Sequence, residues 1–128
     1  MPELTNDLSL EEYISKILQT LGVPAHLKGY RYLRTAILLT IKDMQVVGSV
    51  TKLLYPEVAK LYETTNSKVE RAIRNAIEIS WERGNTDLFE ELYGYSNKDG
   101  RERPTNSEYI ANIADQIQVR LRQMKNES

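Results

Sequence analysis

The feature that most constrains this chain is the spacing of its apolar residues, which recur every three to four positions in one segment after another. Such spacing places apolar side chains on one face of an α-helix, whereas a half-buried strand alternates at every second position. No segment alternates in that way over a useful length, and no internal repeat or low-complexity tract is present. The sequence therefore predicts an all-α fold, a compact bundle of about six helices.

Capping residues and helix breakers set the expected boundaries of these helices. Ser9 to Glu12 and Thr105 to Glu108 both have the capping-box pattern, in which a Ser or Thr side chain and a Glu side chain three residues later each accept a backbone N–H of the other residue. Helices are expected over residues 9–21, 27–44, 56–62, 67–83 and 86–93, and from 105 onward. Thr65 or Asn66 would cap the fourth helix and Thr86 the fifth, and residues 96–103 would form a polar loop.

The length and composition fit one globular domain. With 128 residues, we expect a tail over residues 1–8 and a single helical domain over residues 9–125. The absence of cysteine excludes disulfides, thiolate catalysis and zinc fingers, and the one histidine, His26, cannot build a multi-histidine metal site. Without a Gly-rich phosphate loop or a metal-spaced cluster, we expect no metal, no cofactor and no enzymatic activity.

The sequence contains neither a membrane-spanning apolar run nor the basic start of a secretory signal. We therefore expect no membrane partner, and a cytoplasmic location fits.

The net charge of −1 hides an uneven distribution along the chain. Residues 1–25 have a charge of −3, residues 26–75 of +5 and residues 76–128 of −3. A basic middle between acidic ends suggests one surface that faces an anionic partner such as nucleic acid. Chance segregation of charges is the alternative.

Residues 56–83 have the pattern of a helix-turn-helix. The small Ala59 would sit where the two helices cross closely, with Val58, Tyr62, Val69 and Ile73 filling the space between them. Any two packed helices could show the same spacing. Many such motifs have glycine directly after the position of Tyr62, for a left-handed turn. Here that residue is Glu63, and a longer turn could relieve the need for glycine.

The second helix of this motif has one polar, cationic face. At 100° per residue, the apolar residues fall on the opposite side, and the face collects Ser67, Lys68, Arg71, Arg74 and Asn75, with Glu70 at its edge. Arginine can pair with guanine, asparagine with adenine and glutamate with cytosine. Glu78 and Glu82 follow on the same face and would repel phosphates, so only the N-terminal half should enter a major groove. A solvated amphipathic helix is the alternative.

Weaker candidates for contact with the DNA backbone are polar residues around the preceding helix and the turn. They are His26, Lys28, Arg31, Arg34 and Thr65. Each of them could instead be an ordinary surface residue. Lys98, Arg101 and Arg103 could also touch the backbone, but Asp99 and Glu102 among them favour a plain solvated loop.

Five motifs point to a known family. VPAHLKGY, YPEVAK, KVERAIRNAIE, WERGN and PTNSE occur in this order, within a match over about residues 10–122. The chain resembles the C-terminal DNA-binding domain of the master sporulation response regulator of endospore-forming Firmicutes, the stage 0 sporulation protein A type. The resemblance implies a domain of about six helices that binds a short box in double-stranded promoter DNA. It also implies occupation of tandem boxes by a head-to-tail homodimer. Transcription would be activated or repressed, with activation through the primary sigma factor of RNA polymerase.

The resemblance also implies site residues. The DNA contacts carried over are Ser67, Glu70, Arg71 and Arg74, within a family pattern S-R-V-E-R-A-I-R-H-A. Lys68 and Asn75 stand where the family has Arg and His, so an altered or relaxed box is expected. A sigma-contacting region is implied at Glu82, Arg83, Asn85, Asp87 and Leu88, and a dimer-contact helix at Tyr109, Ile113 and Ile117.

The resemblance covers only the effector part of such regulators, since no receiver domain is found in this chain. Two origins stay open, an excised fragment or a stand-alone effector, and the opening MPELTNDLSLEEY favours the second. The function expected is a sequence-specific DNA-binding regulator of sporulation-type genes. The alternative is a receiverless protein-interaction module that modulates a full-length response regulator by dimerisation.

Overall fold

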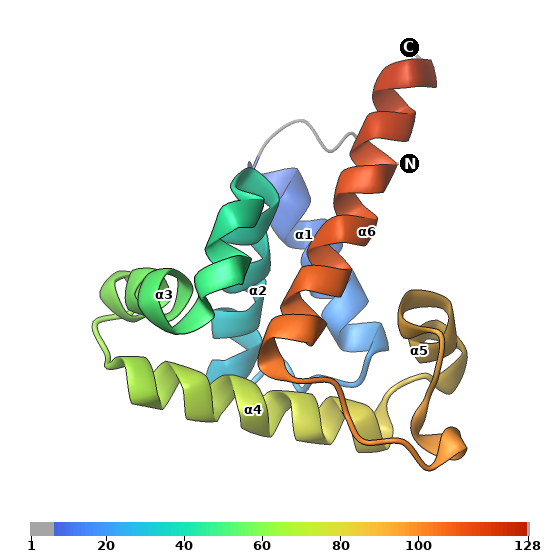
Figure 1. Ribbon diagram of the computed structural model, residues 1–128, viewed down its shortest axis with the longest axis horizontal. Coiled ribbons are helices and arrows are strands. Elements are labelled where there is room, and N and C mark those ends of the chain that lie inside the picture. Colours follow the sequence, from blue (N-terminus) through green and yellow to red (C-terminus); the bar gives the residue numbers. More distant parts are fainter. Residues whose placement is uncertain (1–6, 128) are drawn as a thin grey trace.

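A computed structural model describes residues 7–127 of the chain, and these residues form six α-helices (Figure 1). The helices are α1 (Asp7–Thr20), α2 (Lys28–Lys42), α3 (Tyr55–Leu61), α4 (Asn66–Arg83), α5 (Thr86–Tyr93) and α6 (Asn106–Glu127). Three short helical segments join them: the 3₁₀-helix η1 (Met44–Ser49), the π-helix η2 (Val50–Leu54) and the 3₁₀-helix η3 (Asn97–Asp99). Residues 7–127 contain no strand, and the predicted all-α bundle of about six helices is confirmed.

Two predicted caps are present at the expected places. The Thr65 hydroxyl accepts a hydrogen bond from the backbone N–H of Lys68 at 3.3 Å and so caps α4. The box between Thr105 and Glu108 is complete: the Glu108 N–H donates to the Thr105 hydroxyl at 3.2 Å, and the Thr105 N–H donates to the Glu108 carboxylate at 3.0 Å. These bonds favour the charged carboxylate and lower the pKa of Glu108 below its ordinary value.

Two other predicted caps are wrong. Helix α1 begins at Asp7, so Ser9 lies inside the helix and is not its N-cap. Residues 7 and 8 of the tail expected over residues 1–8 belong to α1, and residues 1–6 lie outside the described residues. At α5, the side chain of Asn85 rather than Thr86 accepts the Leu88 N–H, at 3.1 Å. Asn and Thr can both cap a helix, and here the loop geometry favours the earlier residue.

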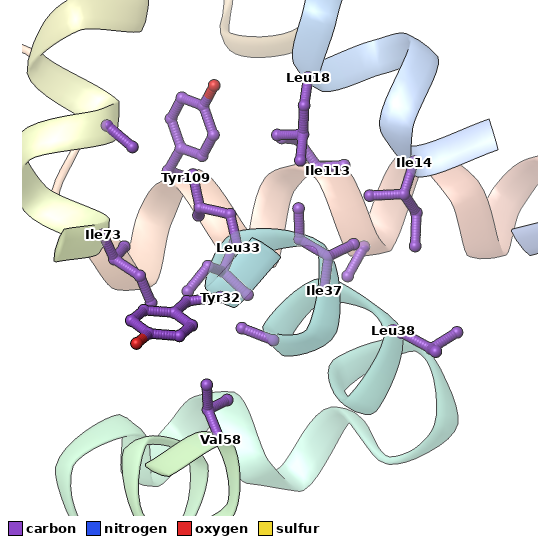
Figure 2. Packing of buried hydrophobic residues seen from close by; sticks show 14 of the residues in the cluster. Ile14, Leu18, Tyr32, Leu33, Ile37, Leu38, Val58, Ile73, Tyr109 and Ile113 are labelled. Carbon is purple, nitrogen blue, oxygen red and sulfur yellow. The ribbon is translucent and has the colours of Figure 1, made fainter. Parts of the chain in front are cut away.

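Helix α2 lies at the centre of the molecule and packs against α1, α4 and α6. Figure 2 shows Leu33 and Ile37 of α2 pointing into the apolar core between Leu18 of α1 and Ile113 of α6. All four side chains have no exposed surface. Helix α4 lies across one end of α2 and α6, with α3 at its N-terminal end and α5 beyond its C-terminal end (Figure 1).

The crossing of α2 and α4 is unusually close because Gly29 has no side chain. A Cβ atom built on Gly29 would lie 2.2 Å from the backbone carbonyl oxygen of Ala72 and 2.9 Å from the Cβ of Ala76. No real side-chain atom tolerates the first of these distances. The close approach positions Lys28, at the first turn of α2, beside the N-terminal half of α4.

Candidate nucleic-acid interface

The predicted helix-turn-helix is formed by α3, the turn of residues 62–65 and α4. Val58, Val69 and Ile73 are fully buried between the helices, and Ala59 is 4% exposed at their crossing. The Tyr62 ring lies 5.1 Å from the Tyr32 ring, measured between centroids. The packing that the sequence pattern predicted is thus present in the fold.

The turn itself differs from the expectation. The Thr64 N–H donates to the Ala59 carbonyl at 2.9 Å, which closes the end of α3. Glu63 between them has a φ of 53°, in the left-handed region that favours glycine. The turn is therefore not lengthened to avoid this conformation, and a side-chain-bearing residue adopts it.

The N-terminal half of α4 presents the predicted polar face. After the first residue, Asn66, which is also exposed, five side chains of this half are exposed to solvent, and Glu70 between them is half-buried. The five are Ser67, Lys68, Arg71, Arg74 and Asn75. Because the buried residues of α4 occupy the opposite side, this face points away from the core.

Arg74 and Glu70 form an ion pair one helical turn apart on this face. Their side chains are 44% and 34% exposed. Exposed pairs of this kind stabilise a helix by about 0.3–0.5 kcal/mol. Arg74 can therefore exchange the Glu70 carboxylate for another acceptor at little cost in free energy.

A groove of about 250 Å³ lies beside the same face, between α2, the turn and α4. It is lined by Lys28, Tyr32, Thr64, Lys68, Arg71 and Ala72. Three cations from two helices therefore surround one groove, which is a suitable environment for a phosphate group. Of the weaker candidates, the structure brings Lys28 to this groove.

The remaining weaker candidates are placed differently from one another. The Arg34 guanidinium donates to the Ser15 hydroxyl at 3.1 Å and lies 5.4 Å from the Tyr30 ring centroid, so it faces α1 and not the groove. Arg31 and His26 are exposed. The Arg31 carbonyl accepts a long hydrogen bond from the Tyr62 hydroxyl at 3.5 Å, which places this residue beside the helix-turn-helix.

Helix α6 also contributes to this surface, through a contact that the helix periodicity of the sequence does not predict. The side-chain amide of Asn106 donates to the Tyr55 hydroxyl at 2.8 Å and to the Glu70 carbonyl at 3.3 Å. It thereby joins the first residues of α6 and α3 to α4. Burial raises the pKa of Tyr55, an effect that the hydrogen bond from Asn106 partly offsets. The PTNSE motif was a signal for this contact, since its asparagine is the residue that makes it.

The two regions implied for protein partners also differ. Glu82, Arg83, Asn85 and Asp87 are exposed at the junction of α4 and α5, and Leu88 is half-buried there. Tyr109, Ile113 and Ile117 of α6 are instead no more than 1% exposed. The expectation that these three side chains contact a second copy is corrected, because they are used by the core of the same chain.

Two general findings concern the part of the chain that the structure describes. Residues 7–127 contain no cluster of three or more His, Cys, Asp or Glu side chains that could hold a metal ion. None of the helices formed by these residues is both long and apolar enough to cross a membrane.

Comparison with known families agrees with this arrangement. The model of the family described as "Sporulation initiation factor Spo0A C terminal" matches residues 14–117, which run from α1 through the helix-turn-helix to α6. The match covers most of the chain, and it includes every element around the polar face of α4. The chain therefore belongs to the Spo0A C-terminal family, whose members are helical DNA-binding domains that regulate transcription in sporulation.

Proposed function

We propose that this chain reads a specific base sequence by inserting the N-terminal half of α4 into the major groove of promoter DNA. The observation that supports this most is the face of five exposed polar side chains, Ser67, Lys68, Arg71, Arg74 and Asn75, at the start of the second helix of a helix-turn-helix. Recognition helices commonly dock through their N-terminal residues.

The charged side chains on this face and Asn75 have chemical roles that follow from their hydrogen-bond donors and acceptors. Arg71 and Arg74 can each donate two hydrogen bonds to guanine, and Asn75 can pair with adenine. Glu70 can accept from cytosine once Arg74 has turned toward its own base. Lys68 offers a point charge instead of a two-pronged donor, so it discriminates between bases less than an arginine would.

The groove beside this face supports a contact to the DNA backbone. Lys28 reaches it from α2, and Lys68 and Arg71 from α4. A phosphate there would fix the register of α4 in the major groove without reading bases. Binding should therefore weaken steeply with rising salt concentration.

The test begins with selection of a preferred box from a pool of random duplexes, followed by titration of the chain against that box. Arg71→Ala or Arg74→Ala should cost about 1–3 kcal/mol of binding and relax the base preference, and Lys28→Ala should weaken all duplexes equally. Arg122→Ala is the matched control, because it removes an equal charge from the exposed C-terminal part of α6, far from α4 (Figure 1). Equal affinity for box and random duplexes, unchanged by either α4 substitution, would contradict the proposal.

Protein partners on DNA are part of the proposal. The exposed residues Glu82, Arg83, Asn85 and Asp87 are offered as the contact to a sigma factor, and a homodimer on tandem boxes would form through exposed residues of α6 or its neighbours. The alternative, an interaction module that acts by dimerising with a full-length regulator, is distinguished by the same titration. It predicts weak binding to every duplex together with co-purification of that regulator in the absence of DNA.

A further inference from the structure

Arg103, in the loop between α5 and α6, forms an ion pair with Glu78 of α4. Its guanidinium Nη2 lies 3.1 Å from the carboxylate Oε1 of Glu78. Both side chains are largely exposed, at 41% and 47%. Exposed pairs contribute little to folding stability, so stability gives little reason for this one.

Glu78 is placed where a free carboxylate would oppose DNA binding. It lies one helical turn after Arg74, which is about 6 Å further along the axis of α4. It is exposed on the same side of the helix as the base-reading residues. If the DNA backbone lies beside Arg74, Glu78 is within about one Debye length of a phosphate. At physiological salt, the repulsion between the carboxylate and that phosphate is then only partly screened.

The position of Arg103 is fixed by the loop around it. The Asn97 amide donates to the Trp81 carbonyl at 2.8 Å and ties the loop to α4. Pro104 is buried, and the capping box at Thr105 fixes the chain directly after it. Arg103 is thus supported on both sides by anchored backbone.

Arg103 also lies at the border between two grooves. One, of about 530 Å³, is lined by the carboxylates of Glu78, Glu82 and Glu102. The other, of about 320 Å³, is lined by the ion pair of Glu70 and Arg74 and by the first turn of α6. Arg103 lines both, so it stands between the acidic half of α4 and the half that reads bases.

We infer that Arg103 is a positioning residue for DNA binding: it neutralises Glu78 and holds that carboxylate toward the α5–α6 loop, away from the phosphates beside α4. This inference rests on the proposed function. It assigns a role to a loop arginine that the sequence pattern favoured as plainly solvated. The loop sets how far along α4 the DNA can approach.

The test is a double-mutant cycle on the box recovered by selection, with Arg103→Ala, Glu78→Gln and the double variant titrated at low salt. Arg103→Ala should weaken binding about three- to eight-fold, because it frees Glu78 to turn toward the DNA. In the Glu78→Gln background the same substitution should change affinity less than two-fold. Arg101→Ala is the matched control: Arg101 carries the same charge in the same loop but stacks over the Tyr95 ring, 4.2 Å from its centroid. It should change affinity less than two-fold.

Two outcomes would overturn the inference. An equal loss from Arg103→Ala in both backgrounds would mean that the guanidinium contacts a phosphate directly. An equal loss from Arg101→Ala and Arg103→Ala would mean that net charge alone matters. Thermal unfolding of each variant checks that the fold is kept. If Arg71→Ala leaves DNA binding unchanged, the proposed function itself fails. If Arg71→Ala weakens binding but the double-mutant cycle shows no coupling between Arg103 and Glu78, only the role of Arg103 is contradicted.

Discussion

Glu63 adopts a left-handed backbone conformation at the turn of the helix-turn-helix, although it has a side chain. Its φ of 53° allows the Thr64 N–H to reach the Ala59 carbonyl and the chain to turn into α4. For residues other than glycine this conformation costs about 1–2 kcal/mol. The backbone hydrogen bond from Thr64 to Ala59 holds the turn in this conformation. The turn therefore stores strain at the point that orients α4, the helix proposed to enter the major groove.

Glu63→Gly should raise the free energy of unfolding by about 0.5–1 kcal/mol, since relief of the strain exceeds the entropy that glycine loses on folding. Urea denaturation measures the change. Glu63→Ala is the control: it shortens the exposed side chain but keeps the strain, so it should leave stability within about 0.5 kcal/mol of the parent chain. A glycine variant less stable than the alanine variant would show that the turn is unstrained.

At the scale of the elements, the crossing of α2 and α4 determines which cations meet. The absence of a side chain at Gly29 lets the two helices approach until backbone meets backbone at Ala72. Lys28, Lys68 and Arg71 then share one groove although they come from different helices. A wider crossing would separate them without changing a single charged residue.

Gly29→Ala should therefore lower both stability and DNA affinity. The added Cβ would lie 2.2 Å from the Ala72 carbonyl oxygen, and the overlap should cost at least about 1–3 kcal/mol of unfolding free energy while it displaces Lys28 from the groove. Chemical denaturation and titration with the selected box give the two readouts. Gly48→Ala is the control, because a Cβ there has no neighbour within 4 Å, and it should leave both unchanged. A Gly29→Ala chain as stable as the Gly48→Ala chain would contradict the close crossing.

At the scale of the whole molecule, one buried hydrogen-bond network joins four helices. The Ser80 hydroxyl of α4 donates to the Leu21 carbonyl, directly after α1, at 2.6 Å. It lies 2.7 Å from the Tyr109 hydroxyl of α6, which must be the donor because the only serine proton is already used. The Tyr93 hydroxyl of α5 donates to the Tyr109 carbonyl at 2.9 Å. Burial raises the pKa of both tyrosines, so the hydroxyls stay protonated as this network requires.

Ser80→Ala should cost about 2–3 kcal/mol of unfolding free energy, because it leaves the Leu21 carbonyl and the Tyr109 hydroxyl buried without their partner. Tyr109→Phe should cost about 1 kcal/mol, since Ser80 keeps its bond to Leu21. Denaturant titration of the two variants gives the order. A larger loss for Tyr109→Phe than for Ser80→Ala would contradict the assigned direction of the bond.

Local sequence patterns predict the helices, most of their ends and the polar face of α4. Helix periodicity and capping depend on residues a few positions apart, so they can be read along the chain, as Thr65 and Thr105 show. Such patterns do not distinguish neighbouring residues that cap equally well: Thr86 was predicted to cap α5, and Asn85 caps it. The family motifs indicate that DNA is the molecule this face is expected to contact.

Which faces stay exposed, and which distant residues meet, depends on how the helices pack together. Apolar side chains of α6 that could have met a second copy are buried against α2, α4 and α5. Arg34 turns to α1 while Lys28 turns to α4, and Arg103 reaches Glu78 from a loop 25 positions away in the sequence. Such choices depend on how helices cross and how closely their backbones approach. Those distances are set by the whole core, and no short stretch of sequence contains them.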